Sequence, residues 1–317
     1  GGINPTSVIG GKVLNFGTNA KIGQGEYIVF EADESDGSFL KLLPCIAVVT
    51  NIDADHLDHY KFFEGLKEAF LSYINNVPFY GYSVLCIDDT IVSDILPKVE
   101  RPFVTYGFSE HADFRAQNVR PGNGGTLYDC YYRGERLGEL KLPLLGRHNV
   151  VNSLAVVAVA LDLGLSFGTV REGLAEFRGV GRRMERVAEE RGILVMDDYG
   201  HHPTEIRATI EALKNLGRRL VVVFQPHRYT RTQLLWDEFG SCFAGADLLF
   251  LTEIYPAGEE PIEGVTSALI REAIVKREAG DVTLVPRFED IPDMVVKTLR
   301  EGDIVLTLGA GDIYKCA

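Results

Sequence analysis

The chain has 317 residues, 46% of them hydrophobic, so it can bury a substantial core and is long enough for about two domains. Its net charge of −13 argues against the basic surface that nucleic-acid binding requires, so we expect no nucleic-acid partner. The five cysteines form no CxxC pair, which predicts reduced thiols in a cytoplasmic protein rather than a disulfide framework or a zinc knuckle.

Short apolar runs followed by polar residues recur along the chain and predict strands. They lie within residues 26–36, 45–56, 81–89, 101–107, 193–202, 219–228, 246–255 and 303–312. The runs are continuous rather than alternating, which is typical of parallel strands covered on both faces. Amphipathic stretches such as residues 203–217 and 266–280 lie between them and predict helices. This alternation predicts an α/β fold with doubly wound sheets.

The middle of the chain departs from this rhythm. Residues 112–146 alternate polar and apolar side chains around two turns, which predicts a small antiparallel meander inserted into the first domain. Residues 146–177 predict two helices, and the apolar stretch 150–168 is too interrupted by polar residues to span a membrane, so we expect a buried helix and no membrane insertion. Residues 178–187 have the composition of a linker. We place the boundary near Gly181, giving domains 1–180 and 181–317.

Two acidic clusters follow strands that are neighbours in the chain. The first contains Glu31, Asp33, Glu34 and Asp36, and the second contains His56 with Asp53, Asp55 and Asp58. In open α/β sheets, ligands bind outside the carboxyl ends of the strands, and oxygen-rich clusters suit a hard cation such as Mg²⁺. Solvated loop acids are the better explanation of a single cluster, but two clusters at adjacent predicted strand ends favour a functional site. A zinc-dependent hydrolase would require more histidines than His56 and His59.

Residues 146–153, "GRHNVVNS", place two amides on one face at the start of a predicted helix. Asn149 and Asn152 are three residues apart. A helix cap is the ordinary interpretation of Asn149, and recognition of a base edge or a phosphate is the alternative.

In the second domain, polar side chains cluster after two predicted strands. The side chains concerned are Asp197, Asp198, Tyr199, His201 and His202 after one strand, and His227, Arg228 and Arg231 after the next. Arginine forks bind carboxylates and phosphates in bidentate fashion. Surface ion pairs would explain any one of these arginines, but histidine and arginine together at consecutive strand ends indicate an anion site.

Six motifs in order resemble the Mur ligase family, from about Ser7 to about Tyr314. They read "EADESDGSF", "TNIDADHLDHY", "GRHNVVNSLA", "GVGRRME", "DDYGHHPTEI" and "FQPHRYTRT". The residues of the last two motifs are most similar to those of the members that add L-alanine. Members that recycle murein tripeptide are the alternative.

The resemblance implies a central parallel-sheet ATPase-type domain followed by a C-terminal Rossmann-like domain. It implies ATP-dependent ligation of L-alanine to the carboxylate of UDP-N-acetylmuramate in peptidoglycan precursor synthesis, through an acyl phosphate and with Mg²⁺. Two anions have to meet in such a reaction, and metal and guanidinium cations make this possible.

The resemblance also assigns roles to individual residues. It implies Glu31 and His56 as magnesium ligands and His148, Asn149 and Asn152 as nucleotide contacts. Arg183 matches the arginine at the phosphates, Asp198 the acid near the ribose, and Tyr199 the adenine neighbour. His201, Arg228 and Arg231 match the site of the incoming amino acid. Of these, His56, Arg183 and Asp198 are the expected catalytic residues.

The sequence differs from the family pattern in one respect. It contains no GxxxxGK[ST] phosphate loop, and the nearest string, "IGGKVLN", has Val13 where a Ser or Thr is required. We therefore expect the central domain to be N-terminally truncated and the chain to be inactive alone. A metal-dependent hydrolase and a non-catalytic module that keeps the ligase fold are the remaining alternatives.

Overall fold

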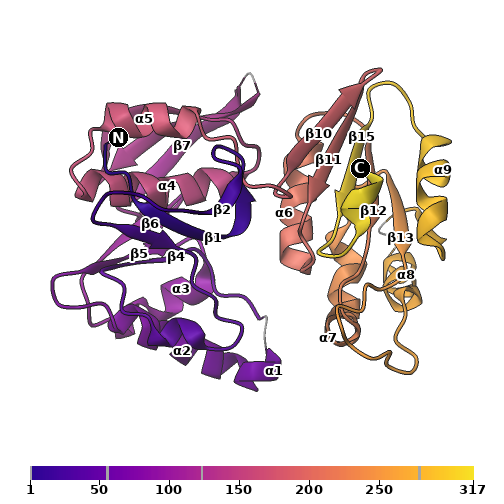
Figure 1. Ribbon diagram of the computed structural model, residues 1–317, viewed down its shortest axis with the longest axis horizontal. Coiled ribbons are helices and arrows are strands. Elements are labelled where there is room, and N and C mark those ends of the chain that lie inside the picture. Colours follow the sequence, from indigo (N-terminus) through magenta and orange to yellow (C-terminus); the bar gives the residue numbers. More distant parts are fainter. Residues whose placement is uncertain (1, 55–56, 123, 278–279) are drawn as a thin grey trace. The chain divides into compact units, whose positions relative to one another are not determined.

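The computed structural model describes residues 2–54, 57–122, 124–277 and 280–317 (Figure 1). The chain forms two compact units, Gly1–Arg178 and Gly179–Ala317, called unit 1 and unit 2 below. Each contains a six-stranded sheet with helices packed on it, so the predicted α/β fold is confirmed.

Unit 1 is built on a sheet with strand order β4-β5-β6-β7-β8-β9. The strands are β4 (Ile46–Val49), β5 (Tyr82–Cys86), β6 (Phe103–Gly107), β7 (Phe114–Gly122), β8 (Gly125–Tyr132) and β9 (Glu135–Leu142). β4 to β7 run parallel, whereas β8 pairs antiparallel with β7, and β9 pairs antiparallel with β8. The predicted antiparallel meander is therefore present, and it continues the parallel sheet.

Helices cover both faces of this sheet. They are α1 (Leu57–Tyr60), α2 (Phe63–Asn75), α3 (Thr90–Ile95), α4 (Arg147–Asp162) and α5 (Phe167–Ala175), with α4 and α5 on one side and α2 and α3 on the other (Figure 1). Successive strand residues face opposite sides, so Val84 packs in the cluster with α4, and Leu85 packs in the cluster with α2 and α3. The predicted buried helix is α4, where Leu154 and Val157 are fully buried. Across the described residues, no helix has the length and apolar character needed to cross a membrane.

A second, three-stranded sheet in unit 1 was only partly predicted. It consists of β1 (Thr6–Val13), β2 (Thr18–Lys21) and β3 (Ile28–Phe30), with β1 antiparallel to β2 and parallel to β3. The apolar run predicted β3 alone, because Gly10 and Gly11 interrupt β1 in the sequence. A Cβ atom at Gly10 would lie 3.2 Å from a Glu31 carboxylate oxygen, so the glycine allows this carboxylate to approach the backbone closely.

Unit 2 has the strand order β10-β11-β15-β12-β13-β14. The strands are β10 (Glu185–Glu190), β11 (Ile193–Asp198), β12 (Leu220–Phe224), β13 (Leu248–Thr252), β14 (Val282–Val285) and β15 (Ile304–Leu308). The helices are α6 (Pro203–Lys214), α7 (Tyr229–Cys242), α8 (Ser267–Lys276) and α9 (Ile291–Val296). All strand pairs are parallel except β10 with β11.

One boundary was wrong in this region. The linker expected over residues 178–187 ends before Glu185, where β10 begins and pairs Glu185 with Asp197. Charged residues dominate β10, and none of its side chains is buried, so its sequence lacks the apolar signal of a strand. Pairing with β11 stabilises it instead.

Burial along α8 leads to a prediction about the stability of unit 2. Ile274 is 1% exposed and its neighbour Val275 is 56% exposed. We expect Ile274→Ala to lower the free energy of unfolding by about 2–5 kcal/mol, because it removes buried methyl groups and leaves a cavity. Val275→Ala should change it by no more than about 0.5 kcal/mol. Urea unfolding followed by the fluorescence of Trp236, which lies on the adjacent helix α7, measures both. Equal losses from the two variants would contradict this account of the core.

Candidate functional site

The carboxyl ends of β11, β15 and β12 lie side by side in unit 2 and gather three loops. β15 pairs with both neighbours, so Asp198 lies opposite Leu308, and Leu308 lies opposite Phe224. Strand order changes direction here, which is the position where open α/β sheets bind ligands. Two residues of the predicted site, Asp198 and Tyr199, come from the end of β11.

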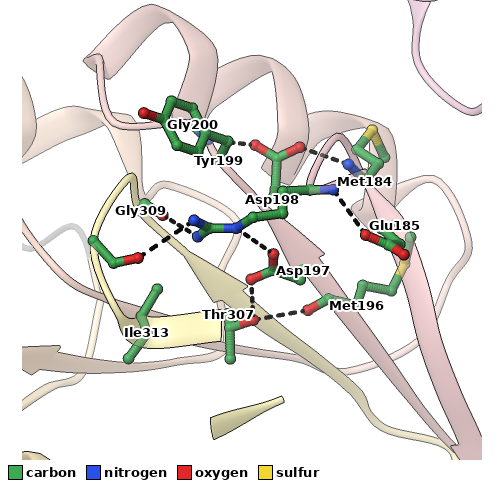
Figure 2. Close-up of polar contacts among 12 residues, drawn as sticks. Met184, Glu185, Met196, Asp197, Asp198, Tyr199, Gly200, Thr307, Gly309 and Ile313 are labelled. Carbon is green, nitrogen blue, oxygen red and sulfur yellow. Dashed lines mark hydrogen bonds and ion pairs between the residues drawn. The ribbon is translucent and has the colours of Figure 1, made fainter. Parts of the chain in front are cut away.

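Asp198 is a buried carboxylate bound by backbone groups. Met184 N donates to one oxygen over 2.7 Å, and Gly200 N donates to the other over 2.8 Å (Figure 2). Burial raises the pKa of Asp198 to about 6, although these two N–H donors and the charge of Arg183 oppose the shift. The carboxylate is therefore fixed in position and poorly solvated, as a group that binds a ligand hydroxyl would be.

Arg183 and Glu205 form an ion pair beside Asp198. Arg183 Nη1 lies 3.2 Å from Glu205 Oε1, the Arg183 side chain is 51% exposed, and its guanidinium carbon lies 5.6 Å from the centre of the Tyr199 ring. Burial opposes ionisation of Glu205, but the charge of His201, the N–H groups of His201 and His202 and the charge of Arg183 outweigh it and lower its pKa. Glu205 also closes a capping box at the start of α6. Arg183 is thus accessible to an anion while one carboxylate holds it.

Four rings form a row across the strand ends. The ring centres of Tyr199 and His201 are 5.4 Å apart, those of His201 and His227 are 5.6 Å apart, and His227 stacks on Tyr255 at 5.7 Å. Burial, together with the positive charges of His201, Arg231 and Arg228, lowers the pKa of His227 to about 4. Arg231 Nη1 lies 3.3 Å from His227 Nδ1, and a guanidinium can only donate, so this nitrogen accepts. His227 is therefore a neutral imidazole at neutral pH.

Arg228 begins α7 with a backbone that non-glycine residues rarely adopt. Its φ angle is 71°, and its N–H donates to Tyr255 O over 2.8 Å. Its guanidinium lies 4.0 Å from a Glu259 carboxylate oxygen. Glu259 accepts from both the N–H and the hydroxyl of Thr230, at 3.1 and 2.6 Å. Positive φ at a functional position stores strain that the surrounding contacts offset, so Arg228 is presented by a fixed turn.

The structure brings together the predicted residues of unit 2 and adds others that sequence reasoning missed. Asp198, Tyr199, His201, Arg228 and Arg231 lie at the carboxyl ends of the strands or at the start of the following helix. Arg183 lies in the turn before β10, where it pairs with Glu205 in the first turn of α6. Glu259, Tyr255 and Arg182 were not assigned a role. Glu259 and Tyr255 follow the predicted strand at 246–255, so their position at a strand end was the available signal.

The predicted magnesium ligands are only partly described. Glu31 follows β3, and its Oε2 accepts from Gly10 N over 2.7 Å. His56 lies outside the described residues, so its pairing with Glu31 stays a prediction. The acids Asp33 and Asp36 accept from the N–H groups of Ser35 and Ser38 in local turns, which is the ordinary interpretation of loop acids. Within the described residues, no three His, Cys, Asp or Glu side chains form a group that could hold a metal ion.

The start of α4 carries the predicted nucleotide contacts of unit 1. Asn149 Nδ2 donates to Leu145 O over 2.7 Å, so this amide fixes the turn before the helix, and Asn152 is exposed. The neighbouring Arg147 guanidinium lies 3.9 Å from the centre of the Phe108 ring. His148 lies at the same helix start and is half-buried.

The buried Asp198 carboxyl leads to a prediction about its titration. Its folded-state pKa is about 6, above the value of about 4 for an unperturbed aspartate. Between these pH values the folded chain keeps a proton that the unfolded chain has lost. The contribution of this group to stability is therefore fully present below about pH 4, falls as the pH rises to about 6 and is constant above.

We expect a ¹³C-aspartate-labelled chain to show a carboxyl signal that titrates near pH 6. Asp198→Asn should remove this signal. Control variant Asp237→Asn, on α7, should leave it in place. A signal near pH 6 that persists in Asp198→Asn would contradict the assignment.

Comparison with known proteins shows what this chain is similar to. Residues 13–160 match the family model of the Mur ligase middle domain, and residues 182–311 match that of the Mur ligase glutamate ligase domain. The chain is 54% identical over 318 residues to the UDP-N-acetylmuramate–L-alanine ligase of Geobacter sulfurreducens, which covers 99% of this chain and 69% of that protein. The corresponding ligase of Geotalea daltonii is 54% identical over 316 residues, with the same coverage.

Solved structures agree with this result. The UDP-N-acetylmuramate–alanine ligase of Thermotoga maritima superposes with a TM-score of 0.80 at 28% identity, over 99% of this chain and 67% of that chain. A murein peptide ligase of Psychrobacter arcticus superposes with a TM-score of 0.69 at 23% identity over 99% of this chain and 70% of that chain, which shows a shared fold. Family models that match both halves of the chain, and relatives 54% identical over 99% of it, show that this protein belongs to the Mur ligase family.

Proposed function

We propose that this chain provides the ligase machinery for the ATP-dependent joining of L-alanine to the carboxylate of UDP-N-acetylmuramate. The observation that carries the proposal is 54% identity, over 99% of the chain, to a ligase named for these two substrates. The recycling of murein tripeptide has weaker support, since the murein peptide ligase above shares 23% identity. The alternative of a metal-dependent hydrolase is not supported, because the chain belongs to a family of ligases.

The reaction joins two anions before an amine attacks. The muramate carboxylate takes the γ-phosphoryl group of ATP, which gives an acyl phosphate and ADP. The amine of alanine then attacks the acyl carbon, the carbon–oxygen bond to phosphate breaks, and an amide, a phosphate ion and a proton result. Little covalent chemistry falls to the protein, so positioning and charge neutralisation are its tasks.

In unit 2, we assign nucleotide binding to Arg183, Asp198 and Tyr199. The half-exposed guanidinium of Arg183 suits phosphate oxygens, since a planar fork donates two parallel hydrogen bonds. The fixed carboxylate of Asp198 suits a ribose hydroxyl, which donates to it. The Tyr199 ring offers a flat apolar face to the adenine base.

We assign binding of the incoming alanine to His201, Arg228 and Arg231. Two arginines within one turn of α7 attract a carboxylate, and Glu259 beside Arg228 limits their net positive charge. The neutral His227 lies between His201 and Tyr255 and accepts from Arg231, so it orients this guanidinium without adding a charge. A small apolar side chain such as the methyl group of alanine fits beside rings of this kind.

In unit 1, we assign binding of the nucleotide to His148, Asn149 and Asn152. We assign coordination of Mg²⁺ to Glu31 and His56. The Glu31 carboxylate is a hard oxygen ligand held by the N–H of Gly10, which fits Mg²⁺. When bound, this ion would neutralise triphosphate charge, which lowers the repulsion between the two anions. The amide of Asn149 already bonds to Leu145, so it would contact a nucleotide through its remaining oxygen.

The proposed function is tested by supplying a phosphate loop. The 317-residue chain has no GxxxxGK[ST] string, so we expect no alanine-dependent phosphate release from it, because the amides and lysine that bind the phosphates are absent. Joined to the segment that precedes the matched region in the Geobacter sulfurreducens ligase, it should convert UDP-N-acetylmuramate, ATP and L-alanine to UDP-N-acetylmuramoyl-L-alanine. We call this protein the joined ligase, and mass spectrometry detects its product.

Three controls sharpen this test. The segment alone should form no product, and Arg183→Ala in the joined ligase should lower kcat/KM by about 100-fold or more, since a charge-assisted contact to phosphate is lost. Offering murein tripeptide instead of alanine separates the recycling alternative. A joined ligase that folds, binds ATP and makes the tripeptide product, or no product, would contradict the proposal.

The alanine assignment predicts the kinetics of an Arg228 variant. Arg228→Ala in the joined ligase should raise the KM for alanine by about 10–100-fold, because a charge-assisted bond to the carboxylate is lost. The KM for ATP should change by less than about threefold. Arg271→Ala, on the exposed surface of α8, serves as the matched control and should change neither value. An unchanged KM for alanine would remove Arg228 from the alanine site.

A further inference from the structure

Arg182 is the residue next to Arg183, and all its described contacts lie within unit 2. Its Nε donates to Asp197 Oδ2 over 2.9 Å, its Nη2 to Gly309 O over 2.6 Å, and its Nη1 to Gly311 O over 3.3 Å. Its side chain is 24% exposed, whereas that of Arg183 is 51% exposed. Arg183 is open to a ligand, whereas each of the three nitrogens of the Arg182 guanidinium donates to the protein.

Two aromatic rings lie near the same guanidinium. The Arg182 guanidinium carbon lies 5.1 Å from the centre of the Tyr199 ring and 4.5 Å from that of the Tyr314 ring. These distances are within the range of cation–π attraction. The backbone adds a further link, since Tyr199 N donates to Arg182 O over 2.6 Å. Tyr199 is therefore tied to Arg182 through both its ring and its main chain.

Asp197 holds Arg182 from the interior of the sheet. It is 3% exposed, and its second oxygen accepts from the hydroxyl of Thr307 on β15 over 2.6 Å (Figure 2). Successive residues of a strand point to opposite faces, so Asp197 and Asp198 at the end of β11 have separate tasks. Asp198 binds the turn at Met184, and Asp197 fixes the guanidinium.

The backbone around Arg182 is strained. Arg182 and Met184 have φ angles of 59° and 49°, in the left-handed region that costs a non-glycine residue of order 1–3 kcal/mol. This turn delivers Arg182 to Asp197 and the N–H of Met184 to Asp198. The loop after β15 is equally constrained, because a Cβ at Gly309 would lie 2.5 Å from Gln225 O. Three chain segments thus converge on one guanidinium.

We propose that Arg182 is a positioning residue for the nucleotide: it orients the Tyr199 ring and the loop 309–314 without contacting the ligand. This inference rests on the proposed function, in which Tyr199 lies against the adenine. A lysine at this position keeps the charge but lacks the planar fork, so it cannot bond to Asp197, Gly309 and Gly311 together or stack against the two rings. The ring of Tyr199 would then lose its fixed orientation.

The chain contains a matched control for this arginine. Arg219 Nη1 lies 2.9 Å from Asp303 Oδ2, with 24% and 3% of the two side chains exposed, which closely resembles the Arg182–Asp197 pair. Arg219 precedes β12 and Asp303 precedes β15, so the pair lies at the starts of the strands, at the opposite edge of the sheet from the site. The two pairs are alike in geometry and burial and differ in location.

The experiment compares Arg182→Lys with Arg219→Lys in the joined ligase. We expect both variants to lower the Tm, because each loses part of a buried ion pair. Arg182→Lys should raise the KM for ATP about fivefold to tenfold, the size of a lost cation–π and orientation effect, and should change the KM for alanine by less than about twofold. Arg219→Lys should change neither KM by more than about twofold.

Equal KM changes in the two lysine variants, or a parallel rise in the KM for ATP and alanine in Arg182→Lys, would overturn the inference, since a purely structural role moves both alike. If Arg182→Lys fails to fold, Tyr314→Leu replaces it, because Tyr314 is 44% exposed and its ring centre lies 4.5 Å from the guanidinium carbon. That variant should raise the KM for ATP by about threefold, and an unchanged value would overturn the inference. An unmodified joined ligase without activity would instead refute the proposed function.

Discussion

Hydrogen bonding of β15 to both β11 and β12 is the constraint on which the site of unit 2 depends. The central strand comes from residues 304–308, close to the end of the chain, and it separates two strands that are neighbours in sequence. The loops after β11, β12 and β15 consequently meet at one edge of the sheet. Gly309 N donates to Asp198 O over 3.1 Å, and Gln225 N donates to Leu308 O over 3.0 Å, so the loop after β15 bonds to the loops on both sides.

The ionisable groups at this edge have pKa values that are shifted in different directions, and burial is the largest cause acting on each of them. Asp198 has backbone donors instead of a close cation, so desolvation dominates and its pKa rises to about 6. Glu205 has nearby cations and several N–H donors, and its pKa falls despite burial. His227 is surrounded by cations and stays neutral, which leaves the arginines as the permanent positive charges of the site. An anionic substrate therefore meets guanidinium groups whose positions are fixed by neutral or carboxylate neighbours.

In unit 1, polar side chains of the predicted site are also held in place by hydrogen bonds to the backbone. A glycine at position 10 lets the Glu31 carboxylate bond to the backbone of β1, and an amide at Asn149 closes the turn that begins α4. Each of these polar side chains holds a local structure through one of its polar atoms. Such anchoring reduces the side-chain entropy that binding would otherwise cost.

The sequence alone determined the α/β class, most strands, the antiparallel meander and the buried helix α4, because continuous apolar runs and their periodicity report burial directly. It also predicted Asp198, Tyr199, His201, Arg228 and Arg231 as site residues, since polar residues right after such runs mark strand ends, whereas the prediction for Arg183 came from the resemblance to the Mur ligases. The β1–β2 hairpin and β10 were missed because glycines and charges conceal strands that pairing stabilises.

Tertiary structure alone decided the strand order, the neutral state of His227 and the opposite tasks of the adjacent residues Arg182 and Arg183. These depend on partners that are distant in the chain, from Glu205, 22 residues from Arg183, to Gly309, 127 residues from Arg182, and no local pattern encodes such contacts.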